Sequence, residues 1–73
     1  MREPSLDRLL EQMIDAQRAR LLALARRILP DATPEDLLQP HDHELLSANP
    51  QFNFEDGILA GYLAVLAALR ANR

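Results

Sequence analysis

The chain has 73 residues, the length of one small domain, near the size at which a single hydrophobic core is only marginally sufficient. It has no cysteine, which excludes disulfides and thiolate metal sites as stabilising features. Its net charge is −3, and its eight basic residues, all arginine, form no basic stripe, which argues against nucleic-acid binding.

The apolar residues are mainly leucine and alanine, a composition that favours an all-α fold. The first residues lack the charged and then apolar run of a signal peptide, and we expect residues 1–5 to be a frayed end. The charge-free run from Gly57 to Leu69 is shorter than the roughly 20 residues that cross a bilayer. We therefore expect a soluble, cytoplasmic protein without a membrane contact.

The first predicted helix covers residues 6–29, with Ser5 as its N-cap. Its apolar residues repeat at helical spacing and form one stripe: Leu6, Leu9, Leu10, Met13, Ile14, Leu21, Leu24 and Ile28. Gln17 interrupts this stripe near its centre. A buried polar residue of this kind either fixes register and partner choice in a helical assembly or meets water between packed layers, and the sequence leaves both open.

Residues 30–52 form a connection that is too long and too apolar to be a loose linker, so we expect an ordered, partly helical segment. Pro30 ends the first helix. Thr33, followed by Pro34, is a predicted N-cap of a short helix, and Asp42 is the predicted cap of a second one.

The connection carries four candidate partner-binding acids, Glu35, Asp36, Asp42 and Glu44, and no arginine lies between Ile28 and Leu69. This pattern suggests a surface for a basic protein partner, although arginines at the end of the first helix could satisfy the same acids.

Two histidines in the same segment, His41 and His43, are candidate ligands for zinc or another divalent ion. The alternative interpretation is a pair of exposed imidazoles near acids, because His-x-His at a turn fixes no third ligand.

The last predicted helix covers residues 53–71, and we prefer Asn53 over Asn49 as its N-cap. Its bulky residues form one face and its small residues form another. We expect the bulky face to pack on the first helix and to leave the small-residue face uncovered.

The small-residue face contains Gly57 and Gly61, continued by Ala64 and Ala68, a spacing that allows another helix to approach closely. Glycine in a helix interior costs about 1 kcal/mol relative to alanine, so two of them suggest a packing reason. We predict a self-association seam along these four residues, with Gln17 as a further candidate. Two copies would then form a homodimeric four-helix bundle. Packing of the same face on the chain's own first helix is the alternative.

No nucleophile context, phosphate loop or dinucleotide motif is present, so we expect no enzyme and no cofactor. The stretches Leu24–Pro30, Thr33–Pro40 and Glu55–Gly61 resemble those of short uncharacterised bacterial helical proteins, a resemblance that implies a compact helical protein and transfers no functional residue. The sequence as a whole predicts an interaction or dimerisation module. A metal- or small-ligand-binding protein, using the histidine turn or the bundle interior, is the alternative.

Overall fold

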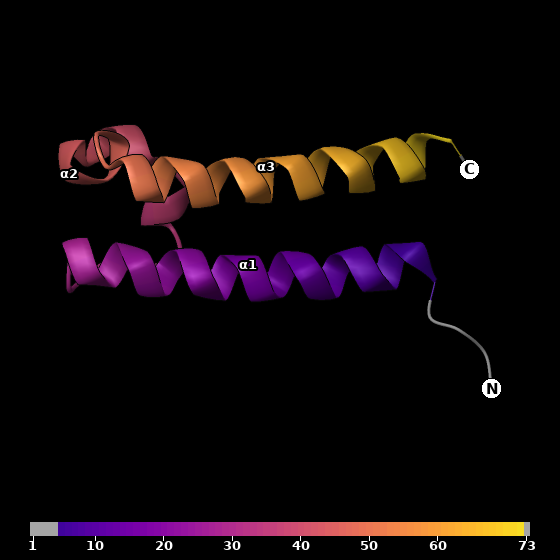
Figure 1. Cartoon of the computed structure of the whole chain (residues 1–73), viewed down its shortest axis with the longest axis horizontal. Coiled ribbons are helices and arrows are strands. Elements are labelled where there is room, and N and C mark those ends of the chain that lie inside the picture. The colour runs from indigo at the N-terminus through magenta and orange to yellow at the C-terminus, as the bar shows by residue number, and fades with distance from the viewer. Residues whose placement is uncertain (1–4, 73) are drawn as a thin grey trace.

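The computed structural model describes residues 5–72 of the chain, and all regular structure in this range is helical. Helix α1 spans Leu6–Ile28 and helix α3 spans Pro50–Ala71. Both lie side by side and run in opposite directions, so that the start of α1 and the end of α3 lie at the same end of the hairpin (Figure 1). Of the predicted frayed end, only Ser5 lies within the described residues.

Helix α1 begins at its predicted cap and ends one residue before the predicted boundary. The Ser5 hydroxyl accepts a hydrogen bond from the Arg8 backbone N–H at 3.2 Å, which satisfies one of the free donors of the first turn. Leu29, which precedes Pro30, has an extended backbone and ends the helix. This conformation is the one that a following proline favours.

Helix α3 begins three residues earlier than predicted, because Asn49 and not Asn53 is its N-cap. The Asn49 side-chain oxygen accepts a hydrogen bond from the Phe52 backbone N–H at 2.8 Å, and Pro50 occupies the first turn, where its missing N–H costs nothing. Asn53 instead donates its side-chain N–H to the Ser47 carbonyl at 2.9 Å.

The connection between the long helices is ordered and partly helical, but its short elements differ from the predicted ones. Its elements are the 3₁₀ turns η1, Asp36–Leu38, and η2, Pro40–Asp42, followed by the short helix α2, Glu44–Ser47. Asp42 ends η2 instead of capping a helix, and His43 precedes α2 without a side-chain cap. Thr33 was expected to accept a hydrogen bond from a backbone N–H as an N-cap. Instead, the Asp36 carboxylate accepts a hydrogen bond from the Thr33 backbone N–H.

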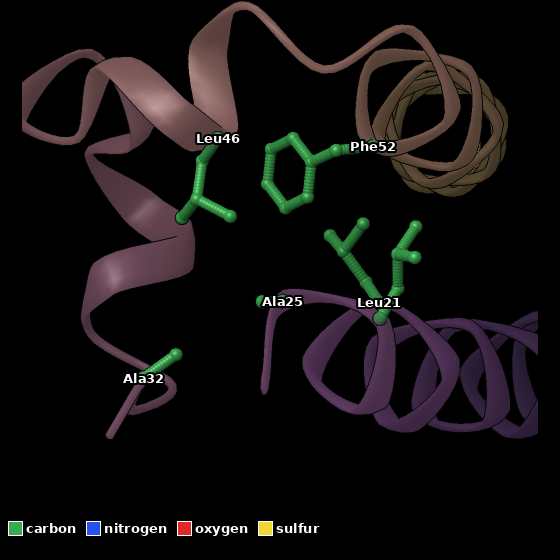
Figure 2. Packing of buried hydrophobic residues seen from close by; sticks show 6 residues of the cluster. Leu21, Ala25, Ala32, Leu46 and Phe52 are labelled. Atoms are coloured by element: carbon green, nitrogen blue, oxygen red, sulfur yellow. The ribbon is translucent and has the colours of Figure 1, made fainter. Parts of the chain in front are cut away.

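The core lies at the closed end of the hairpin, where the connection folds over α1 and α3. It contains six buried apolar residues: Leu21, Leu24, Ala25, Ala32, Leu46 and Phe52. In Figure 2, Leu46 from α2 and Phe52 from α3 point toward Leu21 on α1. All three are fully buried, and each such side chain contributes about 1.5–3 kcal/mol through removal of its surface from water.

The other end of the hairpin is much less covered. Ile14 and Leu66 are buried between the helices, but Leu6, Leu9 and Met13 of the predicted α1 stripe are exposed. A single neighbouring helix covers only one stripe of α1, and these three side chains lie on its flank. The molecule is accordingly elongated, with extents of 44 × 24 × 19 Å.

Candidate interaction surface

The face of α3 that points away from α1 is uncharged and open. All four predicted seam residues, Gly57, Gly61, Ala64 and Ala68, are exposed. A Cβ atom added at either glycine would meet no atom within 4 Å, so neither glycine is required by packing inside the chain. Close packing of this face on α1, the alternative left open by the sequence, is therefore not what the fold contains.

The open face of α3 is flanked by larger apolar side chains. Phe54 is 67% exposed and Val65 is 50% exposed, and by helical spacing both lie beside Gly61. From Gly57 to Leu69 no charged side chain interrupts the surface. Helix faces that meet water normally carry polar or charged residues, so this face has the composition of a buried one.

Helix α1 extends this apolar surface at the open end of the hairpin. Met13 and Tyr62 line the same shallow hollow, together with Ala16, Gln17 and Arg20, which places the Met13 flank of α1 next to α3. Leu6 and Leu9 precede Met13 at helical spacing and share its flank. We call the exposed residues Leu6, Leu9, Met13, Phe54, Gly57, Gly61, Ala64, Val65 and Ala68 the apolar surface.

Gln17 does not belong to this surface, because it is buried between α1 and α3. It is 7% exposed, and its side-chain N–H group donates to both the backbone carbonyl and the carboxylate of Glu55, at 2.9 and 2.7 Å. The amide N–H group of Gln17 thus finds its acceptors within the same chain. The place of Gln17 in the self-association set stays a prediction.

The opposite side of the hairpin carries an ion-pair cluster. Arg70 of α3 donates to Glu11 at 2.7 Å and lies 3.5 Å from the Asp7 carboxylate, both on α1. Helical periodicity does not predict these pairs, since Arg70 and Glu11 are 59 positions apart in the sequence. They fasten the C-terminal turn of α3 to the first turns of α1.

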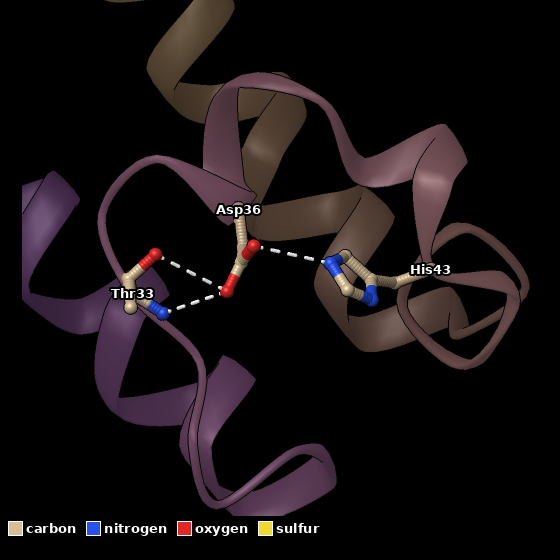
Figure 3. Close-up of polar contacts among 3 residues, drawn as sticks. All are labelled: Thr33, Asp36 and His43. Atoms are coloured by element: carbon tan, nitrogen blue, oxygen red, sulfur yellow. Dashed lines mark hydrogen bonds and ion pairs between the residues drawn. The ribbon is translucent and has the colours of Figure 1, made fainter.

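The acidic residues of the connection do not act as one set. One Asp36 oxygen accepts from the Thr33 N–H at 2.9 Å and from its hydroxyl at 3.2 Å, and the other lies 3.1 Å from His43 Nε2 (Figure 3). The backbone bond from Thr33, then the bond from His43, lower the pKa of Asp36 below its ordinary value of 3.8. Asp36 therefore holds the connection together, whereas Glu35, Asp42 and Glu44 are exposed.

The two histidines have different surroundings. His43 faces Asp36, and His41 lies exposed in η2. Within residues 5–72, no group of three or more His, Cys, Asp or Glu side chains is close enough to hold a metal ion. The predicted pair thus lacks the third ligand that a protein zinc site requires.

A hollow of about 440 Å³ lies between α1, η1 and α3. Its apolar walls are Ala19, Leu22, Pro34, Leu37, Leu38 and Leu59, and Arg18 and Glu35 stand at its rim. We call this hollow the leucine groove. The adjacent leucines at 37 and 38 are a sequence signal for it. Neighbouring side chains on a 3₁₀ turn point about 120° apart, so a thin segment cannot bury both.

Helix α3 also satisfies, by length and composition alone, the requirements for crossing a membrane. Its most apolar 18-residue window has a mean hydropathy of 1.3, and 17% of that window is buried. The charge-free run begins only at Gly57, whereas a window of 18 residues that ends before Arg70 also includes the two acids Glu55 and Asp56. The expectation of no membrane contact therefore stays a prediction.

No protein-family model, curated protein or solved structure matches the chain in the three comparisons made. The function therefore has to be inferred from the surfaces of the chain itself.

Proposed function

We propose that the protein is a self-association module, in which a second copy of the chain covers the apolar surface and the two hairpins form a four-helix bundle. The observation that carries the proposal is the open, uncharged face of α3, which exposes Gly57, Gly61, Ala64 and Ala68 beside Phe54 and Val65. Exposed contiguous apolar surface of this kind marks interaction sites in soluble proteins.

The shape of the chain supports the same proposal. Its radius of gyration is 14.1 Å, whereas a compact domain of this length has about 11 Å. Two helices in one layer bury only one stripe each, and helical domains are normally completed by a second layer. A second hairpin supplies that layer in a four-helix bundle.

The exposed area has the right size for such an interface. The chain exposes 5574 Å², whereas a compact monomer of 8.2 kDa exposes roughly 4500 Å². A stable dimer buries about 800 Å² on each partner, which is of the same order as the surplus. Closed two-fold dimers are also the commonest assemblies of identical chains, so a second copy is the most economical partner.

A lipid bilayer is the competing occupant of the apolar surface. The position of α1 argues against a bilayer. This helix lies along α3 and carries Asp7 and Glu11, both close to Arg70. If α3 crossed a bilayer, α1 would have to leave it or carry its charges into the hydrocarbon, where each costs several kcal/mol.

The test is sedimentation velocity on the wild-type chain and on Ala64→Glu, with Ala23→Glu as matched control. Both alanines are exposed and lie in helix interiors, but Ala23 lies outside the apolar surface. We expect a species of twice the 8.2 kDa chain mass for wild type and Ala23→Glu. Ala64→Glu should be monomeric, because dimerisation would bury an unpaired carboxylate.

Circular dichroism checks that both variants remain helical. A wild-type chain that sediments as a monomer at about 100 μM would reject the proposal, because a specific dimer of this interface size is normally far tighter than that. Flotation of the wild-type chain with lipid vesicles would assign the surface to a bilayer instead.

A further inference from the structure

The leucine groove lies on a different side of α3 from the apolar surface. Leu59, which lines the groove, is two positions from both Gly57 and Gly61, and two residues along a helix turn the side chain by about 200°. A second copy on the open face of α3 therefore leaves the groove accessible. Its occupant has to be argued from its own chemistry.

The groove has the size and lining of a binding site. Its volume of about 440 Å³ falls within the roughly 300–1000 Å³ of protein ligand sites, and four leucines form most of its walls. Leu38 stands at its edge and is 78% exposed, the highest value among the large apolar residues of the described chain. An apolar side chain from a partner would cover Leu38 and remove it from water.

The surroundings of the groove are acidic. Glu35 and Leu38 also line a neighbouring hollow that contains Asp36 and Asp42, so the acidic surface continues directly from the groove. The carboxylates of Glu35 and Asp42 make no hydrogen bond or ion pair with any other residue of the range 5–72. They are free to attract basic groups, and the single arginine of the rim, Arg18, lies on the α1 side.

We propose that the leucine groove binds one basic amphipathic helix of a partner protein. Two apolar residues of that helix, one turn apart, enter the groove, and its lysine or arginine side chains lie over Glu35 and Asp42. The groove is walled by helical segments, which suits the apolar ridge of another helix. The carboxylates of Glu35 and Asp42 would repel nucleic acids and anionic lipid surfaces.

The test is a fluorescence-anisotropy titration with three labelled peptides of about 14 residues, a length that is marginal for a free helix but sufficient for a bound one. The first has leucines at helical spacing and lysines elsewhere. The second has the same leucine positions with glutamate in place of lysine. The third has the composition of the first in an order without helical periodicity. We expect saturable binding of the first peptide only.

Two pairs of variants assign the binding to the groove. Leu38→Ser should weaken binding roughly tenfold, whereas Leu45→Ser, at a leucine of α2 that is 63% exposed and outside the groove, should leave it unchanged. Glu35→Gln should weaken binding about threefold, and more at low salt, whereas Glu44→Gln should have little effect.

The proposal is overturned if the second peptide, with glutamate, or the third peptide, without helical periodicity, binds as tightly as the first. Equal losses in Leu38→Ser and Leu45→Ser would overturn it as well. If Leu38→Ser changes the sedimentation of the protein without any peptide, a second copy of the chain covers the groove, and the basic partner helix is ruled out.

Discussion

Single residues show where sequence reasoning succeeds and where it stops. Gln17 was recognised as a polar residue inside an apolar stripe, and it is indeed buried. Its partner could not be identified, because Glu55 lies 38 positions away and is brought to Gln17 only by the antiparallel packing of α1 on α3. The helical pattern thus predicts burial, but it does not predict which group satisfies the buried amide.

Asp36 makes a pH-dependent contribution to stability. Its pKa is lowered in the folded chain, so folding favours the charged form, and its contribution is fully present above the unfolded value near 3.8. As the pH falls through the lower folded pKa, this contribution is lost. We expect the urea-unfolding free energy of wild type to fall between about pH 5 and pH 2.5 more steeply than that of Asp36→Asn.

The control for this experiment is Asp42→Asn. The Asp42 carboxylate is exposed, and within the described chain it accepts no hydrogen bond, so its replacement should leave the acid slope close to that of wild type. Identical slopes for wild type and Asp36→Asn would show that the Thr33–Asp36–His43 contacts do not link folding to protonation.

The two long helices were predictable as elements because periodicity over more than 20 residues is a strong signal. The short elements of the connection were not, since a 3₁₀ turn of three residues has almost no sequence pattern of its own. There, competing local caps decide the outcome. Thr33 and Asp42 both have side chains that commonly serve as N-caps. In the structure the Asp36 carboxylate accepts from the Thr33 N–H, and Asp42 caps no helix of the described chain.

The N-cap of α3 can be tested by two substitutions. Asn49→Ala removes the bond to the Phe52 N–H at the N-cap, and we expect a loss of about 1 kcal/mol in urea unfolding. Asn53→Ala removes only the exposed bond to Ser47 and places a better helix former inside the helix, so the expected change is close to zero. A larger loss in Asn53→Ala would mean that the helix starts at Asn53 after all.

For the whole molecule, the all-α class and the presence of two long helices follow from composition and periodicity, but their relative direction did not. The predicted connection, residues 30–52, was long enough to reach either end of the first helix. The direction is set by the closed-end core, in which Leu46 and Phe52 meet Leu21. Contacts between residues far apart in sequence therefore decide what the periodic patterns leave open.

The two glycines of α3 allow the fold and the proposed assembly to be separated by opposite effects. A Cβ atom at Gly57 or Gly61 meets nothing within 4 Å in the chain, so Gly57→Ala with Gly61→Ala should stabilise the helix by up to about 2 kcal/mol in dilute urea unfolding. In the proposed dimer the same methyl groups would separate two closely packed helices. The dissociation constant of the dimer, measured by sedimentation, should therefore rise. A variant with both a more stable fold and tighter association would place the contact between copies away from these glycines.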